Sequence, residues 1–365
     1  MSTQEIKPQG TRNAGTRLWL GFRKHVLSNY LLWVLVGTFI LGSLTSPYFM
    51  TARNIWNVLT FAAVVSVIAV GQFLVVVTGG IDLSVGSNAA LTTVVTAVLM
   101  KAGYSATVAA IAGLAVASMC GAINGALVVR ANITPFVATL AMMSIARGAS
   151  YMVQEGSLIS ITDENFVRWF AGKVGPVPTP VIIFLLVTLV AGYVMRETTG
   201  GRRLYAIGGN REAARLSGLP VAKCIFSVYL LGGLLSGLAG LILAAQLTQG
   251  SSLLAQGYEL DSIAAVVVGG ASLAGGTGTP VGAVTGGLII GMLGNIMNLL
   301  QLSSEPQMVV KGILIIIAVM FISGGVKRLP SHSRWAKLKD MLRMFRRRDA
   351  DIARESGKEG QREEI

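Results

Sequence analysis

The chain has 365 residues, of which 53% are hydrophobic and 13% are charged. Soluble globular chains are roughly 25% charged, so this composition excludes an ordinary soluble domain, a disordered chain, a collagen and a coiled coil. The formal net charge is +13, and we expect membrane topology to explain this basic excess rather than binding to nucleic acid. The composition therefore predicts an all-α polytopic membrane protein.

Long stretches without charged residues mark the expected membrane spans. A helix needs about 20 residues to cross the hydrocarbon core, so the 43 uncharged residues between Asp261 and Glu305 are too many for one crossing, and glycines divide them in two. We expect about ten transmembrane helices within a domain at residues 29–328, preceded by an N-terminal segment at residues 1–28. The expected spans are residues 29–46, 58–78, 84–100, 105–129, 133–152, 179–196, 224–246, 259–273, 280–300 and 307–325.

Lysine and arginine are distributed unevenly between the two sides that these spans define. With the N-terminus inside, the cytoplasmic segments hold 24 of these residues and the outer loops hold four. Basic loops stay in the cytoplasm, so both termini are predicted to be cytoplasmic. The first 28 residues are polar and no short apolar region precedes a small-residue cleavage site, so we expect the first span to remain as an anchor.

Small residues spaced four apart recur along the spans. In lipid the hydrophobic effect does not draw helices together, so close packing of small residues must do so. We expect tight helix contacts at these pairs: Gly121/Gly125, Gly233/Gly237, Ser236/Gly240, Gly282/Gly286 and Gly287/Gly291.

A glycine-containing stretch at residues 78–87 separates two expected spans. Gly79 and Gly80 end one helix, and Asp82 or Ser84 can cap the next. Irregular backbone at this depth must be buried in protein or must line a wet cavity. Two roles stay open for Asp82: a helix cap near the inner interface, or a direct contact with a transported solute.

Residues 197–223 form a charged segment on the predicted cytoplasmic side. Asn210 is a favourable N-cap, the alanines that follow are strong helix formers, and Gly218 followed by Pro220 ends the helix. We expect a two-turn helix outside the bilayer, and its small, capped form favours docking of a partner over an ordinary connecting loop. It comprises Asn210, Arg211, Glu212, Ala213, Ala214, Arg215, Leu216, Ser217 and Gly218.

A second glycine-containing break, at residues 266–276, repeats the pattern of the first. Three valines precede Gly79 within residues 75–80, and three valines precede Gly269 and Gly270. Two broken helices in separate halves of a chain indicate a transport pathway. The candidate pathway residues are Gly79, Gly80, Asp82, Ser84, Asn88, Gly269, Gly270 and Ser272.

Polar residues inside the spans are few. Arg147 and Lys311 lie toward the outer ends of their spans, and we expect both to snorkel to the outer interface. Neutral polar residues are expected mainly to bond neighbouring helices; these are Gln72, Asn88, Asn124, Asn295 and Asn298.

The tail at residues 329–365 is charged and begins with apolar residues near helical spacing. Trp335, Leu338, Leu342 and Phe345 alternate with lysines and arginines, a pattern typical of an amphipathic helix on anionic membrane lipids. We therefore expect the first part of the tail to lie on the inner leaflet.

The motifs of soluble enzymes are absent from the sequence. It holds no G-x-x-x-x-G-K-[ST] loop and no H-E-x-x-H motif, and His25 and His332 are its only histidines. We expect no catalytic residue, metal site or cofactor in this chain. Uphill transport would then need energy from a partner or from an ion gradient.

Three runs of residues together resemble motifs of sugar ABC-importer permeases. They are GGIDLSVGS at residues 79–87, GNREAARLSG at residues 209–218 and GGTGTPVGA at residues 275–283. The resemblance covers roughly residues 30–328 and is to the ribose, xylose, arabinose and galactose type. This type is related to permeases for branched-chain amino acids, nucleosides and autoinducer-2.

The resemblance implies a permease subunit that moves a monosaccharide, a pentose or hexose, across the bacterial inner membrane. It implies three partners: a second permease copy, a cytoplasmic tandem-domain ABC ATPase that binds ATP and Mg, and a periplasmic sugar-binding protein. It also implies that residues 210–218 dock on the ATPase and that the region of Asp82 lies near the translocation path. The tail at residues 329–365 departs from the family, which usually ends soon after the last span.

Other functions stay open. A nucleoside, autoinducer-2 or a branched-chain amino acid is an alternative solute within the same family. An ion-coupled secondary transporter is an alternative of another class, but it requires carboxylates on the path, and only Asp82 is a plausible one. A membrane scaffold without transport would not need glycine-broken helices.

Overall fold

The computed structural model describes residues 30–322. The predicted N-terminal segment at residues 1–28 and the predicted leaflet-binding tail at residues 329–365 lie outside the described residues. Contacts divide the chain into one unit that ends at Ala318 and a second that begins at Val319. The account below concerns the first unit; residues 319–322 are the last turn of its final helix.

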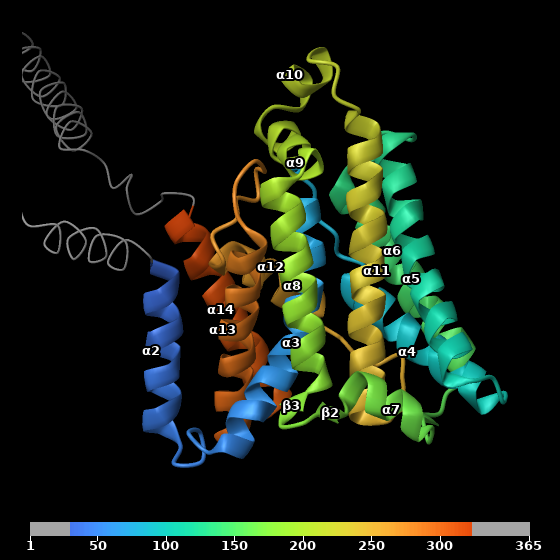
Figure 1. Cartoon of the computed structure of the whole chain (residues 1–365), viewed down its shortest axis with the longest axis vertical. Coiled ribbons are helices and arrows are strands. Elements are labelled where there is room, and N and C mark those ends of the chain that lie inside the picture. Colours follow the sequence, from blue (N-terminus) through green and yellow to red (C-terminus); the bar gives the residue numbers. More distant parts are fainter. Residues whose placement is uncertain (1–29, 323–365) are drawn as a thin grey trace, which may run out of the picture. The chain divides into compact units, whose positions relative to one another are not determined.

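The described residues are almost entirely helical (Figure 1). Four short strands form two antiparallel pairs in the loops, β1 with β4 and β2 with β3. In chain order the elements are α2 (Tyr30–Thr45), α3 (Ala52–Val76), α4 (Val85–Lys101), α5 (Ala106–Val129), α6 (Pro135–Gln154), β1 (Ile159–Ser160), α7 (Glu164–Ala171), β2 (Lys173–Val174), β3 (Val177–Pro178), α8 (Thr179–Glu197), α9 (Thr199–Gly209), α10 (Arg211–Leu216), α11 (Val221–Leu247), β4 (Gln249–Gly250), α12 (Tyr258–Val268), α13 (Pro280–Leu299) and α14 (Ser304–Ile322).

The predicted all-α polytopic fold is confirmed. Six helices within the described residues, α3, α5, α6, α8, α11 and α13, are long and apolar enough to cross a membrane. Each of the ten expected spans overlaps a helix, but α12 has only 11 residues. At ~1.5 Å per residue it covers about 16 Å of a hydrocarbon core of about 30 Å. It is therefore a half-helix, and ten complete crossings stay a prediction.

The helices differ in how deeply they are buried. In the most apolar stretch of α3, 83% of the residues are buried, against 28% in α6. A helix that is apolar on all sides belongs in the interior of a bundle, and α3 packs there against α11, α12 and α13. The weakly buried α6 instead turns apolar side chains such as Phe136, Val137 and Ile145 outward.

The small residues predicted to pack helices do so. A Cβ on Gly121 would meet the backbone of Tyr229 and Gly233 on α11, and a Cβ on Gly233 would meet Ala117 and Gly121 on α5. The two helices therefore touch backbone to backbone, an approach that only glycine permits. The other predicted glycines make similar contacts: Gly125 with Phe226, Gly237 with Ala117, Gly240 with Ala89, Gly282 with Gly269, Gly286 with Ala265, Gly287 with Ser66 and Gly291 with Ala62.

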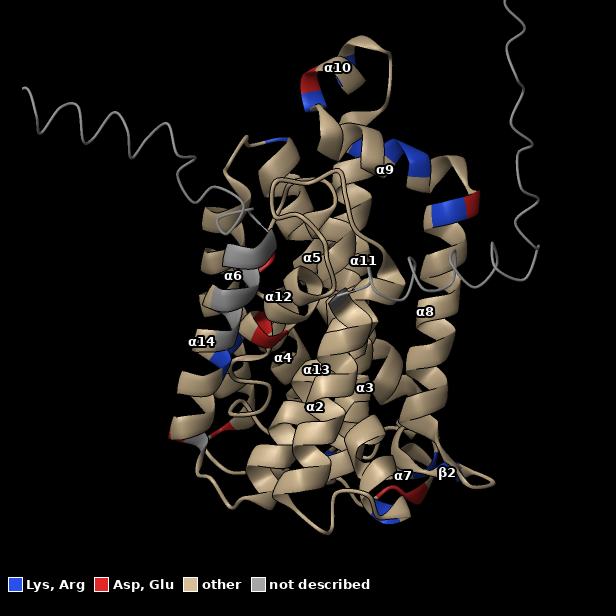
Figure 2. Cartoon of the chain, turned by 90° about the vertical axis from the view of Figure 1, so that its left-hand side faces the viewer, with Lys and Arg blue, Asp and Glu red and all other residues tan. Residues whose placement is uncertain are grey.

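Charged residues concentrate at the two ends of the helices. The end that carries α9 and α10 lies opposite the end that carries α7, β2 and β3 (Figures 1 and 2). Most lysines, arginines and carboxylates within residues 30–322 lie at these ends, whereas acidic residues of α12 lie between them (Figure 2). This separation is the pattern of a bundle whose middle is surrounded by hydrocarbon.

Candidate functional site

The first helix break follows α3 directly. The N–H of Gly79 donates to the carbonyl of Val76 (2.9 Å), and the N–H of Gly80 donates to the carbonyl of Val75 (3.2 Å). Gly79 has a φ of 80°, a left-handed conformation in which glycine carries no steric penalty. These nested bonds satisfy the carbonyls that the end of a helix leaves free, so the chain leaves α3 in a defined direction.

Asp82 lies fully buried between α3 and α4, two residues before Ser84, the N-cap of α4. Its Oδ1 accepts hydrogen bonds from the backbone N–H of Ser84 (2.8 Å) and from the Ser84 hydroxyl (2.6 Å). With its amide oriented to satisfy both partners, Gln72 donates to the Asp82 carbonyl (3.0 Å) and accepts from the Asp82 N–H (3.3 Å). Ser84 is the N-cap of α4, but its side chain makes no capping hydrogen bond to the helix. Asp82 instead supports the turn into α4 by bonding this N-cap residue, and contact between Asp82 and a solute stays a prediction.

The Ser84 hydroxyl joins three segments. It accepts hydrogen bonds from the side-chain amides of Asn88 on α4 (3.2 Å) and Asn124 on α5 (2.9 Å). All three side chains are fully buried. Asn124 therefore bonds a neighbouring helix as predicted, and so does Asn295 on α13, which exchanges two hydrogen bonds with Asn54 on α3 (2.9 and 3.0 Å).

The second break copies the turn of the first. The N–H of Gly270 donates to the carbonyl of Val267 (2.9 Å), and the N–H of Ala271 donates to the carbonyl of Val266 (3.1 Å). Gly270 has a φ of 90° and occupies the place that Gly79 has in the first turn. The repeated valine and glycine pattern in the sequence thus corresponds to a repeated structure.

The two breaks and the charged segment at residues 197–223 meet at one point, which we call the glycine junction: residues 77–79, 208–209 and 275–276. The N–H of Gly276 donates to the carbonyl of Val77 (2.9 Å). A Cβ on Gly208, near the end of α9, would overlap that carbonyl and would lie 2.5 Å from the nitrogen of Gly276. Three regions that the sequence marked separately are therefore in direct backbone contact.

A cavity of about 430 Å³ borders the second break. Gly269 and Gly270 form part of its wall, together with residues of α2 and α13. Ser272 is partly buried, and its hydroxyl accepts from the N–H of Ala274 (3.2 Å). Of the candidate pathway residues, Gly269 and Gly270 thus border this cavity, whereas Asp82, Ser84 and Asn88 are fully buried.

The predicted two-turn helix is α10. Asn210 Oδ1 accepts from the N–H of Ala213 (2.9 Å), and Gly218 follows the helix with a φ of 77°, so both predicted ends are confirmed. Glu212 accepts two hydrogen bonds from Arg215 (2.6 and 3.0 Å), and this contact lowers the pKa of Glu212 below its ordinary value. Apart from Ala214, which is buried, the residues of α10 are exposed, including Leu216 at 73%.

Two charged residues within predicted spans have internal partners that the sequence analysis did not predict. Arg147 on α6 donates hydrogen bonds to the backbone carbonyls of Ser252 and Leu254 (2.9 Å to Leu254). Lys311 on α14 forms an ion pair with the buried Asp261 on α12 (2.7 Å). Internal partners satisfy both cations, and the prediction that they reach the outer interface stays a prediction. Glu259 and Asp261, which lie together between two long uncharged stretches, were the one sequence signal for such a pair.

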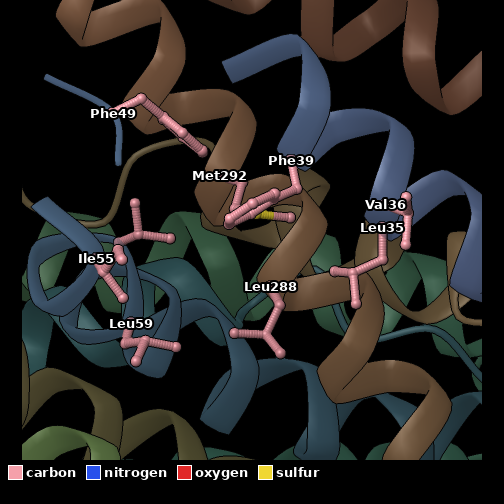
Figure 3. Close-up of a pocket in the computed structure, with 9 residues that line it drawn as sticks. Leu35, Val36, Phe39, Phe49, Ile55, Leu59, Leu288 and Met292 are labelled. Atoms are coloured by element: carbon pink, nitrogen blue, oxygen red, sulfur yellow. The ribbon is translucent and has the colours of Figure 1, made fainter. Parts of the chain in front are cut away.

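An apolar pocket of about 370 Å³ lies between α2, α3 and α13 (Figure 3). Its walls are aliphatic, aromatic and thioether side chains that point toward one another from these helices. Sugar hydroxyls need hydrogen-bonding partners when they leave water, so this pocket does not suit a sugar. The lining residues are Leu35, Val36, Phe39, Phe49, Ile55, Val58, Leu59, Leu288 and Met292.

Comparison with known proteins agrees with this architecture. Residues 54–319 match the family described as "Branched-chain amino acid transport system / permease component". No solved structure was found to match the chain.

Three relatives share much of the sequence. The ribose import permease protein RbsC of Escherichia coli K12 is 42% identical over 324 residues, which cover 88% of this chain and 98% of the relative. The D-allose transport system permease protein AlsC of the same organism is 39% identical over 79% of this chain and 91% of the relative. The L-arabinose ABC transporter permease protein AraH of Azospirillum brasilense is 36% identical over 76% of this chain and 82% of the relative. The chain therefore belongs to this family of permease components and is a multi-pass protein of the inner membrane.

Proposed function

We propose that this chain is the membrane-spanning subunit of an ATP-driven importer that carries a monosaccharide, a pentose or hexose, across the bacterial inner membrane. The observation that carries the proposal is the glycine junction, where two matched helix breaks touch the segment that leads to α10. Relatives named for ribose, D-allose and L-arabinose transport support a monosaccharide as the solute. A nucleoside, autoinducer-2 or a branched-chain amino acid is the alternative within the family.

Three protein partners follow from this proposal. A cytoplasmic ABC ATPase with two nucleotide-binding domains binds ATP and Mg and supplies the energy. A periplasmic sugar-binding protein delivers the solute, and a second copy of this chain completes the path. In this arrangement both termini and the end that carries α9 and α10 face the cytoplasm, and ten helical segments contribute to the membrane domain.

The exposed surface of α10 is the proposed docking site for the ATPase. Leu216 is 73% exposed and stands beside the Glu212–Arg215 ion pair, and an apolar anchor rimmed by charges is a usual feature of protein interfaces. Residues 210–218 form this docking element, as the sequence resemblance implies.

The glycine junction supplies the mechanical link. A displacement of α10 moves the end of α9, where Gly208 lies against the carbonyl of Val77 and the nitrogen of Gly276. Both breaks then move together, because the three backbone segments of the glycine junction touch with no side chain between them. ATP binding and hydrolysis thereby favour one of two conformations of the path through their different contacts with the docking surface. The pathway residues of the proposal are Gly79, Gly80, Asp82, Ser84, Asn88, Gly269, Gly270 and Ser272.

Reconstitution tests the proposal. In liposomes that contain this chain, its ATPase and its binding protein, radiolabelled pentoses and hexoses are expected to accumulate only with ATP, and the chain alone is expected to be inactive. Accumulation by the chain alone, driven by a proton or sodium gradient, would establish the ion-coupled alternative instead.

Exchange of the two charges on α10 tests the docking site. The double variant Glu212→Lys/Arg215→Glu keeps an ion pair within the helix and reverses the charges that a partner meets. We expect recovery of the ATPase with the permease to fall by about tenfold or more, as for loss of charged interface contacts. A matched control exchanges no charge and lies outside residues 210–218: Thr199→Ala, at an exposed position at the start of α9. Unchanged recovery of the ATPase with the double variant contradicts docking at α10.

A further inference from the structure

The chain between α11 and α12 packs along α4, with Ser251 and Ser252 buried and Leu253 exposed. A Cβ on Gly250 would lie 2.5 Å from the Cβ of Ala97, near the end of α4, and a Cβ on Gly86, in the first turn of α4, would lie 2.6 Å from the carbonyl oxygen of Ala255. Residues 249–257, the re-entrant segment, therefore extend along most of α4. Beyond the two residues of β4 the segment has no regular structure.

Irregular backbone in a membrane needs internal hydrogen-bonding partners. Thr93 on α4 accepts from the N–H of Ser251 (3.2 Å) and donates its own hydroxyl hydrogen to the carbonyl of Ala90 (2.7 Å). Gln154 on α6 accepts from the N–H of Ser252 (2.6 Å), and Arg147 donates to the carbonyls of Ser252 and Leu254. Side chains of α4 and α6 thus take the place of secondary structure in holding this segment.

Arg147 holds the centre of the segment. Its guanidinium donates hydrogen bonds to two backbone carbonyls of the segment. It also interacts electrostatically with Glu259 in the first turn of α12. An arginine within a bilayer is costly unless protein groups satisfy it, so the guanidinium and the segment stabilise each other. Arg147 and Gln154 are seven residues apart and therefore lie on the same face of α6.

The backbone of the segment is itself constrained. Thr248 and Ala255 have φ values of 50° and 55°, which residues with a Cβ adopt only when their surroundings enforce it. The segment leads directly into α12, and the far end of α12 is the break at Gly269–Gly270. A change in the segment is therefore transmitted along a half-helix toward the glycine junction.

We propose that Arg147 is a positioning residue for transport, which ties the re-entrant segment and α12 to α6 so that they move as one body. The proposal rests on the transport function proposed above. Without the guanidinium, the carbonyls of Ser252 and Leu254 lose their donor, the segment detaches from α6, and motion at the glycine junction no longer reaches α6.

A cysteine reporter in the assembled transporter tests this role. Ser252 is 1% exposed, and its hydroxyl has no hydrogen-bond partner among the described residues, so Ser252→Cys removes no contact. Cys224 is changed to serine, and the native Cys120, 6% exposed on α5, serves as an internal control for general loosening. The transporter in liposomes is treated with a membrane-impermeant maleimide, and labelling at both cysteines is measured by mass spectrometry.

With Arg147 present, the reporter thiol at position 252 is expected to react slowly. Arg147→Gln is expected to raise its labelling rate by about tenfold to a hundredfold, as for loss of hydrogen bonds to a charged group, with Cys120 unchanged. Sugar uptake, measured without the reporter, is expected to fall about tenfold while recovery of the complex and its ATPase activity stay within about twofold. Arg147→Lys, which keeps a donor, is expected to lie between. Ser144→Ala, at an exposed position one turn earlier on α6, is the matched control. It is expected to change neither the labelling rate at position 252 nor the rate of sugar uptake.

Three results overturn the proposal. In the first, Arg147→Gln leaves the reporter thiol protected. In the second, Cys120 labelling rises in parallel, which indicates general loss of structure. In the third, the reporter thiol becomes reactive but uptake is normal. Failure of the proposed function is distinguishable, because a complex with Arg147 would then show no ATP-dependent uptake, while the labelling comparison would still report on the contact.

Discussion

Substitution of Gly208 by alanine tests whether the glycine junction transmits motion. The Cβ that Gly208→Ala introduces would overlap the Val77 carbonyl and would stand 2.5 Å from the nitrogen of Gly276. Those two atoms also form the hydrogen bond that joins the first break to the end of the second. Real Cβ atoms essentially never approach other atoms within 3.0 Å. One of the three backbone segments of the glycine junction must therefore shift.

The free-energy cost of Gly208→Ala follows from the overlap that it creates and the hydrogen bond that it breaks. Overpacking in a closely packed site costs about 1–3 kcal/mol, and loss of the bond between Gly276 and Val77 adds about 1 kcal/mol. The sum, about 2–4 kcal/mol, corresponds to a factor of roughly 30 to 700 in an equilibrium constant. A penalty of this size exceeds what most surface substitutions cause, and it falls on the contact between α9 and both breaks.

The neighbouring glycine provides a matched control. A Cβ on Gly209 would meet nothing within 4 Å among the described residues, and alanine is the better helix former by about 1 kcal/mol. Gly209→Ala is therefore expected to leave transport unchanged, whereas Gly208→Ala is expected to reduce ATP-dependent uptake more than about tenfold. Both variants are measured in liposomes with the ATPase and binding protein, with ATP hydrolysis recorded in parallel. Equal uptake by both variants would refute the reasoning.

The remaining predictions concern packing and buried charge. Gly121→Val is expected to destabilise the chain by about 1–3 kcal/mol, because its side chain meets the backbone of α11; Gly148→Val, where a Cβ meets nothing within 4 Å among the described residues, is the control, and thermal unfolding in detergent measures both. Asp261→Asn leaves Lys311 without its charged partner and is expected to lower the free energy of unfolding by about 3–5 kcal/mol. The double variant Asp261→Leu/Lys311→Met is expected to restore most of that stability. Equal loss of stability in the single and double variants contradicts a buried ion pair.

The features that sequence predicted correctly are those with local causes. The two breaks follow from glycines after valine runs, and α10 follows from Asn210 and Gly218, because caps and turns are decided within a few residues. The glycine contacts between helices were also predictable, since small residues at helical spacing have few other roles in a membrane.

The features that sequence missed depend on residues far apart. Arg147 and the carbonyl of Ser252 are separated by 105 positions, and Lys311 and Asp261 by 50, so no local pattern joins them. The re-entrant segment was also missed, because residues 224–258 are uncharged throughout and nothing in that composition indicates where α11 ends. Its path depends on the shape of α4, which presents Gly86 to Ala255.

The arrangement of α10 and the glycine junction separates two requirements that evolution can satisfy independently. Gly208 and Gly276 admit no larger side chain without displacement of backbone, so the joint itself tolerates little change. The outward surface of α10 has no such restriction. Under the proposed docking of an ATPase at α10, substitutions there would alter which ATPase is recognised, while the glycine junction is unchanged. A permease of this fold can then acquire a new ATPase partner through substitutions on its surface alone.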